Sequence, residues 1–541
     1  MDARAAGGAL SLYDLDRLYS KAAGRRRILC VGEEPELRQM QALLSRSLGS
    51  SVVTQRTRAS SPEGHIDAAG FDLVAIVETV SGRPLHRSAD CDVILLGSKA
   101  ADVESMRQSY KPRLPRAQAR ADDHVRVVIL NDEGFQRGSG TAVKRQAASF
   151  LLNGWDVGVI AWDGADGPQM PMVTGIYQFL NWYGLRSFSR AERDACKTTD
   201  EIVSAILAKF PFDPDFVIVG NLHGAEWPLE VLARLRQAVG PKVIVYMHDA
   251  YWVTGRCAQP GSCTLYKSGC DATCPTATEY PRLAPARIRD AWSYRARLFT
   301  GEAAIPLVAN SSWTEKVARQ RYGSTASIDT IHLGLDEHLY APSSKEVARR
   351  ILGLPQDRKI VAMGAVSLEN QWKGGPLFAT VHRQLSRRND TGIILFGSAS
   401  HELPCERQFG FVRDERVMPL IYSAADVYVT TATAESFGQT ILEASACGVP
   451  VVAFDVGGIK DIVIDGENGF LVKERSASSI VGAAEQLICD DALRRRMGQN
   501  GRTWVEQHFT LRQQARYWAN YLDQCRLRSG VAEHGAIERL L

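Results

Sequence analysis

Several features that would assign this 541-residue chain to a common class are missing from it. Its net charge is only +3, and it shows no concentrated basic patch of the kind that indicates a nucleic-acid partner. No apolar run reaches the roughly 18 residues that a membrane-spanning helix needs. The N-terminus contains no apolar core ahead of a cleavage site, so it does not predict a secretory signal. These absences predict a cytoplasmic protein without a nucleic-acid partner.

Familiar nucleotide and metal motifs are missing as well. The glycine-rich stretch from Gly138 to Arg145 has neither the G-x-G-x-x-G spacing of dinucleotide sites nor a Walker pattern, and a plain tight turn is a close alternative. No Asp-x-Asp pair is placed to hold a divalent metal against a diphosphate. If the chain handles a nucleotide, its chemistry is therefore expected to be independent of metal and of any other catalytic cofactor.

The chain has 11 cysteines, which in a cytoplasmic protein predict thiols or metal ligands over disulfides. Four of them are clustered in the sequence: Cys257, Cys263, Cys270 and Cys274. Four clustered thiols predict a tetrahedral zinc site, structural because all four positions would be filled. The spacing is irregular and lacks a C-x-x-C knuckle, so free thiols are the main alternative and disulfides a lesser one.

The order of apolar runs predicts an α/β protein with four segments. Residues 1–123 contain three short strand-like runs, a helical stretch and a Pro/Arg/Ala-rich linker, with no readable motif. Residues 124–343 and 344–510 each alternate buried strands with helices, which predicts two Rossmann-like domains. Residues 511–541 predict a C-terminal helix that can cross back to the first of these domains. Open parallel sheets bind ligands at the carboxyl ends of their strands, so a site is expected between the domains.

The most informative stretch runs from Ala425 to Val472 and holds two glutamates, Glu435 and Glu443. The strand-like run VYVTT leads into a Ser-Phe-Gly turn, and the helix-forming run TILEASACG leads out of it. The start of such a helix offers backbone N–H groups to an anion. Carboxylates repel phosphate, so the two glutamates suit the hydroxyls of a ribose or a sugar. The stretch predicts a nucleotide-sugar site, and the alternative is a surface helix with two solvated glutamates.

This block resembles, residue for residue, the E-x7-E signature of retaining GT-B glycosyltransferases of family 4. The resemblance covers roughly residues 125–519 and includes the interdomain segment IHLGLDEHLYAP. It implies a GT-B fold, in which two Rossmann-like parallel-sheet domains face each other across a cleft, here with a small N-terminal α/β extension. It also implies transfer of a sugar, with retention, from a nucleotide-sugar donor such as a UDP- or GDP-sugar to a hydroxyl acceptor.

The same resemblance assigns roles to single residues. It implies that Glu443 holds the ribose, that Glu435 faces the transferred sugar, and that Lys373 neutralises the leaving diphosphate. Further donor-binding positions lie in the turn and in the glycine-rich stretch: Ser436, Phe437, Gly438, Gln439, Gly138, Gly140 and Thr141. The family commonly places an arginine a few residues before the lysine, and this chain has none there. Either one positive charge suffices or another residue supplies the second; an exposed loop lysine is the plain alternative for Lys373.

Two histidines follow predicted strands of the first Rossmann-like domain. His248 comes directly after KVIVYM, where it can donate to a sugar hydroxyl or a phosphate oxygen. The family has a cleft histidine at this place, near the transferred sugar, which implies a catalytic role. A core histidine bound by backbone groups is the alternative. His223, in GNLHG, is a weaker candidate of the same kind.

The cysteine cluster, with HDAYWVTG before it, resembles a family 4 branch linked to bacterial exopolysaccharide and colanic-acid-type assembly. This implies polysaccharide or glycoconjugate synthesis, with a lipid-linked glycan among the acceptors. The arginine- and aromatic-rich run from Tyr280 to Phe299 could rest on an acidic membrane surface as a peripheral contact, although a solvated helix face is the commoner arrangement. Two rivals remain for the whole chain: an epimerase or hydrolase of nucleotide sugars, and a non-catalytic partner subunit with the same fold.

Overall fold

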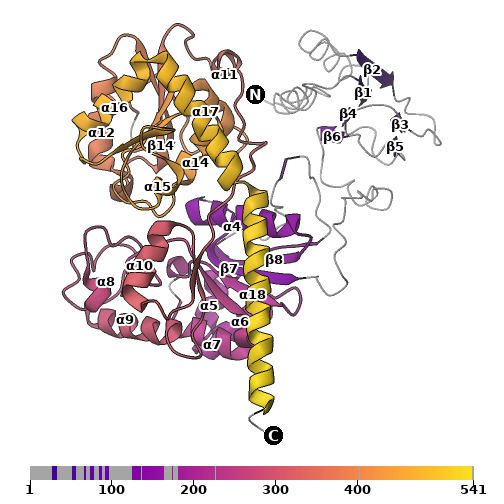
Figure 1. The fold of residues 1–541 in the computed structure, drawn as a ribbon, viewed down its shortest axis with the longest axis vertical. Helices are drawn as coiled ribbons and strands as arrows, with labels where there is room; N and C mark the ends of the chain where they lie inside the picture. Colours follow the sequence, from indigo (N-terminus) through magenta and orange to yellow (C-terminus); the bar gives the residue numbers. More distant parts are fainter. Residues whose placement is uncertain are drawn as a thin grey trace. The chain divides into compact units, whose positions relative to one another are not determined.

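The structure, a computed structural model, describes residues 125–538 except 136, 164–172, 175–180, 226 and 401, together with strands between residues 27 and 96 (Figure 1). Side chains are described as far as Arg526, within the last helix. The chain divides into two compact units, residues 1–122 and 123–541. The helical stretch and the Pro/Arg-rich linker predicted in the N-terminal unit lie outside the described residues.

The N-terminal unit contains a parallel four-stranded sheet in the order β2-β1-β4-β6. Three of its strands are the apolar runs predicted from the sequence, and β2 is an additional strand that pairs with β1. The strands of this unit, including a separate parallel pair formed by the two shortest, are β1 Arg27–Gly32, β2 Ser51–Arg56, β3 Ile66–Ala68, β4 Leu73–Val77, β5 Leu85–Arg87 and β6 Asp92–Leu96.

The second unit begins with a parallel seven-stranded sheet in the order β13-β12-β11-β10-β7-β8-β9, here called the first domain. Its strands are continuous apolar runs because both faces of the sheet are covered. Val127 and Ile129 of β7 belong to a core shared with α4, whereas Val128 and Leu130 pack with residues of α6 and α7 on the other face.

The elements of the first domain are the strands β7 Arg126–Glu133, β8 Asp156–Asp163, β9 Trp182–Ser187, β10 Phe216–Val219, β11 Val243–Met247, β12 Leu307–Ala309 and β13 Ile328–Thr330. Its helices are α4 Arg137–Leu152, α5 Arg190–Ala195, α6 Thr199–Leu207, η3 His223–Ala225, α7 Glu230–Val239, η4 Gly240–Lys242, α8 Leu265–Ser268, α9 Pro285–Phe299 and α10 Ser312–Tyr322.

The second domain is a parallel six-stranded sheet in the order β16-β15-β14-β17-β18-β19. Its strands are β14 Lys359–Ser367, β15 Thr391–Ser398, β16 Arg407–Gln408, β17 Val427–Val429, β18 Val451–Phe454 and β19 Gly469–Val472. Its helices are α11 Lys345–Ile351, η5 Gln371–Lys373, α12 Gly375–Leu385, α13 Met418–Ala424, α14 Gln439–Ala446, α15 Ile459–Ile462, α16 Ala477–Cys489 and α17 Asp491–His508.

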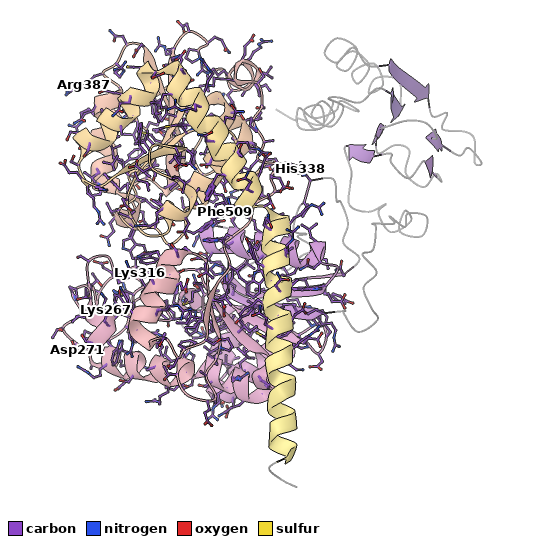
Figure 2. The ribbon with its side chains drawn as sticks, viewed as in Figure 1. Lys267, Asp271, Lys316, His338, Arg387 and Phe509 are labelled. Carbon is purple, nitrogen blue, oxygen red and sulfur yellow. The ribbon has the colours of Figure 1, made fainter. Side chains whose placement is uncertain are left out.

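The chain passes between the two domains twice at one place. Leu335, on the way out of the first domain, donates its N–H to the carbonyl of Phe509 at 2.9 Å and accepts from the N–H of Leu511 at 3.0 Å. Figure 2 shows Phe509 at this junction. Helix α18, Leu511–Glu538, then runs along the first domain and packs on α4, where the rings of Phe150 and Trp518 lie 5.4 Å apart (Figure 1).

The beginning of α4 differs from the sequence expectation. The sequence predicts a glycine-rich loop ahead of a helix that begins near Val143, but α4 begins at Arg137 and includes both glycines in its first turn. A Cβ at position 140 would lie 1.8 Å from the carbonyl oxygen of Gly134. Gly140 therefore allows a tight entry from β7 into α4, and this packing requirement explains part of the glycine content.

Candidate active site

The turn before α14 brings together the site residues predicted in the second domain. After β17 the chain passes through Glu435 and Ser436 to Gly438, the N-cap of α14. Gly438 has a φ of 109°, a left-handed conformation that residues with side chains rarely adopt. The first N–H groups of any helix have no intrahelical partner, and Gly438 has no side chain to cap those of α14, so they can bind an anion.

Lys373 and Glu435 form an ion pair at this turn, in which the Lys373 ammonium donates to Oε2 of Glu435. Gly374 holds the lysine turn against the end of β17, since a Cβ there would lie 1.8 Å from the carbonyl oxygen of Thr431. Gly457 supports the other side, where a Cβ would lie 1.6 Å from the carbonyl oxygen of Glu435. Two close backbone approaches thus position the pair.

Glu443 is more deeply buried, with 6% of its surface exposed. Its Oε2 accepts a hydrogen bond from the Tyr422 hydroxyl at 3.0 Å, and its Oε1 accepts one from Nη2 of Arg145 at 2.6 Å. Burial raises the pKa of Glu443 above its ordinary value, although the positive charge of Arg145 and both hydrogen bonds act in the opposite direction. The carboxylate that the sequence assigns to a ribose is therefore bound by a cation in this structure.

Arg145 reaches this position from the first domain. It lies on α4, is 5% exposed, and stacks its guanidinium 5.2 Å above the ring of Tyr340. Its Nη1 donates to Oε1 of Gln439 at 3.1 Å, and Gln439 donates in turn to the carbonyl of Gly138 at 2.7 Å. These bonds place one positive charge of the first domain along the first turn of α14.

The remaining predicted donor-binding positions divide into those that contact the other domain and those that do not. Ser436 accepts a hydrogen bond from Gln259 at 2.6 Å through its hydroxyl, and one from Ser311 at 2.6 Å through its carbonyl. Phe437 packs its ring 5.9 Å from that of Phe509 inside the core, so only its backbone can face a ligand. Thr141 is half-buried on α4.

His248 lies directly after β11 and is 8% exposed. Neither of its ring nitrogens has a hydrogen-bond partner among the described residues. Burial lowers the pKa of His248 to about 4, with Asp249 opposing the shift and His223 adding to it. The imidazole is therefore neutral near pH 7, and its place beside a bound sugar stays a prediction.

A buried polar cluster lies at the same edge of the sheet. Nε2 of His223 is 2.9 Å from Oδ2 of Asp249, and Nδ1 of His223 is 2.8 Å from the Tyr280 hydroxyl. Asp132, near the end of β7, accepts from the N–H of Gly224 at 2.8 Å, while its other carboxylate oxygen has no partner in the described part of the chain. Burial raises the pKa of Asp132 to about 6, and the charge of His223 opposes this.

The segment from Cys257 to Glu279, which contains the four clustered cysteines, contacts the second domain on both sides of the Lys373–Glu435 ion pair. On one side Gln259 bonds to Ser436, the neighbour of Glu435. On the other side Gln371, two residues before Lys373, donates to Oε2 of Glu279 at 2.9 Å. The segment therefore forms part of the wall around the predicted site.

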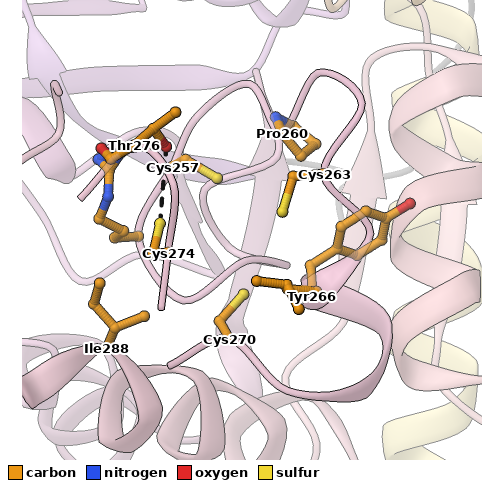
Figure 3. A pocket seen from close by; sticks show the side chains of 10 residues that line it. Cys257, Pro260, Cys263, Tyr266, Cys270, Cys274, Thr276 and Ile288 are labelled. Atoms are coloured by element: carbon orange, nitrogen blue, oxygen red, sulfur yellow. Dashed lines mark hydrogen bonds between the residues drawn. The ribbon is translucent and has the colours of Figure 1, made fainter. Parts of the chain in front are cut away.

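The four clustered cysteines line one cavity of about 20 Å³ and are all free thiols (Figure 3). Cys257 and Cys270 are buried, and Cys263 and Cys274 are half-buried. Within the described part of the chain, no three His, Cys, Asp or Glu side chains lie in an arrangement that holds a metal ion. Zinc would require the thiols to turn further into the cavity, and the structural zinc site stays a prediction.

Two parallel-sheet Rossmann-like domains, joined by a double crossing and followed by a helix that returns to the first domain, define the GT-B fold. Solved structures with this fold include sucrose-phosphate synthase from Thermosynechococcus elongatus, with a TM-score of 0.56 at 19% identity over 75% of this chain and 100% of that chain. Another is HepE of Anabaena in complex with UDP-glucose, with a TM-score of 0.55 at 20% identity over 74% and 100%.

Residues 348–504 match the family Glycosyl transferases group 1, and this range includes Lys373, Glu435 and Glu443. A relative from Corynebacterium aurimucosum, D-inositol 3-phosphate glycosyltransferase, is 34% identical over 36% of this chain and 51% of its own length. The protein of that name from Corynebacterium diphtheriae is 31% identical over 36% and 50%. The chain thus spans about half the length of the curated relatives it matches. Among the described helices, none is long and apolar enough to cross a bilayer.

Sequence reasoning missed several residues of this site, among them Asp132, Asn221 and Arg145. Asp132 lies near the carboxyl end of a buried strand, so the rule that ligands bind at the carboxyl ends of parallel strands could have identified it, as it identified His248. Arg145 carries no such signal, because it lies within a helix and its partners are almost 300 positions away.

Proposed function

We propose that this chain is a glycosyltransferase that moves a sugar from a UDP- or GDP-sugar to a hydroxyl group of an acceptor. One observation carries the proposal. Inside the segment that matches the group 1 family, the start of α14 brings together N–H groups without intrahelical partners, the Lys373 ammonium and two carboxylates. The N–H groups and Lys373 suit a diphosphate, whereas Glu443 suits ribose hydroxyls and Glu435 the hydroxyls of the transferred sugar.

The proposed reaction depends mainly on stabilising charge. As the bond between the sugar and the diphosphate breaks, negative charge develops on the leaving oxygen, next to Lys373 and the α14 N–H groups. Glu435 holds the lysine in place through their ion pair. We propose that transfer proceeds with retention and without a metal, and that the leaving phosphate helps to take the proton from the acceptor hydroxyl.

The first domain supplies groups for hydroxyls. The neutral ring of His248 can donate one hydrogen bond and accept another, which matches a sugar hydroxyl. One oxygen each of Asp132 and Asn221 has no partner among the described residues and can accept a hydrogen bond from a ligand. We therefore place His248 beside the transferred sugar, and Asp132 and Asn221 on the side of the acceptor.

The acceptor we propose is neutral at the reacting end. The curated relatives are named for D-inositol 3-phosphate, but the carboxylates of Asp132 and Asp249, which outnumber the one imidazole of His223 between them, would repel a phosphate bound in the same place. A glycan hydroxyl, free or lipid-linked, agrees better with these charges. We propose that the enzyme acts in bacterial polysaccharide or glycoconjugate synthesis, in the cytoplasm.

A peripheral membrane contact through α9 is part of this proposal. Arg287, Arg289 and Arg297 are exposed on that helix, whereas Arg295 is buried and donates to the carbonyl of Thr254 at 2.7 Å. Only the exposed arginines are available to anionic headgroups. Flotation with liposomes should show binding when anionic lipid is present and none with neutral lipid; equal flotation in both would exclude an electrostatic contact.

Thermal stabilisation by UDP-, GDP- and ADP-sugars, followed by product analysis, tests the central proposal. A bound donor adds RT ln(1 + [L]/Kd) to stability, so the correct nucleotide raises the melting temperature in a concentration-dependent way. Glycosylated product with a neutral acceptor supports transfer. Donor consumed without any acceptor product would indicate an epimerase or hydrolase, and absence of affinity for all three donors would indicate a non-catalytic subunit.

A further inference from the structure

The pairing of Arg145 with the first turn of α14 has no counterpart in the predicted site. Arg145 belongs to the first domain, yet its guanidinium bonds to Gln439 at 3.1 Å and to Glu443 at 2.6 Å. Gln439 is the first residue of α14 and Glu443 lies one turn further along the helix. The guanidinium thus spans the stretch between the proposed diphosphate position and the proposed ribose position.

The charges of the site make a second cation useful at this place. A nucleoside diphosphate carries more negative charge than Lys373 alone can balance, and Lys373 is already paired with Glu435. Lys144, the neighbour of Arg145, forms an ion pair with Glu415 at 2.5 Å and is not bonded to α14. Arg145 is the cation that the first domain presents to the start of that helix.

Burial restricts what else Glu443 can bind while Arg145 holds it. Glu443 is 6% exposed and each of its oxygens already accepts one hydrogen bond, so ribose hydroxyls gain access to the carboxylate when Arg145 withdraws. A guanidinium has five N–H donors in a planar fork that matches phosphate oxygens. Movement along one helical turn would transfer it from Glu443 to a phosphate at the start of α14.

We propose that Arg145 is the second cationic ligand of the donor diphosphate, and that donor binding transfers it from Glu443 to the phosphates. This rests on the proposed function, because it requires a nucleoside diphosphate at the start of α14. Arg145 then takes the role that the family commonly gives to an arginine near the lysine.

The test compares the affinity for a nucleoside diphosphate with that for the bare nucleoside. UDP and uridine, or GDP and guanosine, whichever diphosphate stabilises the wild-type protein, are titrated by calorimetry and by ligand-observed NMR. We expect Arg145→Met to weaken diphosphate binding about 10- to 100-fold, and nucleoside binding to stay unchanged or to tighten because Glu443 is released. Arg145→Lys should recover part of the diphosphate affinity, since it retains a charge but loses the fork.

Lys144→Met is the matched control, because it removes a cation from the same helix without touching α14. It should leave the ratio of diphosphate to nucleoside affinity unchanged. Circular dichroism and melting curves establish that each variant is folded. Equal losses for diphosphate and nucleoside in Arg145→Met, or no loss for either, would overturn the inference and leave the proposed function standing. Absence of diphosphate binding in the folded wild-type protein would remove both.

Discussion

Nη2 of Arg145, on α4 of the first domain, lies 2.6 Å from Oε1 of Glu443, on α14 of the second. Both side chains are more than nine-tenths buried, so this is an ion pair inside the protein and not at its surface. The desolvation of two buried charges largely offsets their attraction. Such a pair therefore contributes more to the relative position of the two helices than to the net stability of the protein. Together with the bond from Arg145 to Gln439, it holds α14 against α4 at the place where the donor is proposed to bind.

The first prediction concerns the stability of this pair. Glu443→Gln should destabilise the protein by about 3–5 kcal/mol, because it leaves the Arg145 charge buried without a counter-charge. Arg145→Met should cost a similar amount for the opposite reason. The double variant Arg145→Met/Glu443→Gln removes both charges and should lie closer to wild type than either single variant. Urea transitions of the four proteins give this comparison, and additive losses in the double variant would contradict a direct pair.

The second prediction separates the roles of Lys373 and Glu435. Lys373→Ala should lower kcat by about 10²–10³-fold, because one charge that stabilises the leaving diphosphate is lost. Glu435→Gln should lower kcat/KM and leave nucleoside diphosphate binding within a few-fold of wild type. Lys359→Ala, which breaks an exposed pair with Asp491 at 2.8 Å in the same domain, serves as the control and should change little. Wild-type rates in either site variant would refute the assignment.

The third prediction uses two glycines with the same backbone conformation. Gly374 and Gly466 both have a φ of 78°, but a Cβ at Gly374 would lie 1.8 Å from the carbonyl oxygen of Thr431, whereas no atom lies within 4 Å of one at Gly466. Gly466→Ala should cost about 1–2 kcal/mol of stability and leave activity intact, since only the positive φ is unfavourable. Gly374→Ala should displace Lys373 as well, and should lose activity at temperatures where the protein is still folded. Equal activity in both variants would exclude a positioning role for Gly374.

The sequence predicted the second domain better than the first, for a physical reason. The turn around Glu435, the helix start at Gly438 and the lysine in η5 are set by short-range features: a strand, a glycine with positive φ and a helix without a cap. Local patterns of this kind can be read from neighbouring residues. The repetition of buried strands and helices predicted the two parallel-sheet domains, and the resemblance of the Glu435–Glu443 block to family 4 implied that they form a GT-B fold.

The interdomain contacts could not be predicted in this way. The partners of Arg145 lie on another domain. From the sequence of an amphipathic helix alone, a buried arginine cannot be distinguished from a polar residue that faces solvent. The cluster around His223 has the same origin, since η3, the end of β11 and the segment after the cysteines meet only in the folded domain. The sequence left His223 as a weak candidate because Asp249 and Tyr280, which fix its ring, are remote or unremarkable in the linear order.

The fourth prediction concerns stability between pH 4 and 7. The pKa of His248 falls from 6.5 to about 4 on folding because of burial, so the unfolded chain binds a proton in this range that the folded protein does not. The part of the free energy of unfolding that depends on His248 is therefore greatest above pH 6.5. It decreases as the pH falls toward 4, by about 3 kcal/mol in all. Asp132 has the opposite sign, because burial raises its pKa from 3.8 to about 6 and protonation then favours the folded state.

The two groups therefore largely offset each other, and variants should separate them. His248→Gln abolishes the stability that wild type loses through His248 at low pH. The melting temperature of this variant relative to wild type should therefore rise as the pH decreases from 6.5 to 4. Asp132→Asn should show a relative fall over the same range. His223 and Asp249 face both groups and remain in each variant, which makes wild type the proper reference. Parallel melting curves for all three proteins across this range would contradict the assigned pKa shifts.

The fifth prediction is structural zinc in the cavity lined by the four cysteines. The thiols of Cys257, Cys263, Cys270 and Cys274 share one small cavity of about 20 Å³, and a zinc ion could hold all four if the side chains turn inward. We expect one zinc per purified chain by mass spectrometry, release of the metal by a mercurial, and a cysteine-to-metal charge-transfer spectrum after cobalt substitution. Cys270→Ser should lose the metal and lower the melting temperature, whereas Cys489→Ser, at an exposed cysteine far along the chain, should do neither. Protein without bound zinc that melts identically with and without chelator would exclude the site and leave four free thiols in the wall beside Gln259.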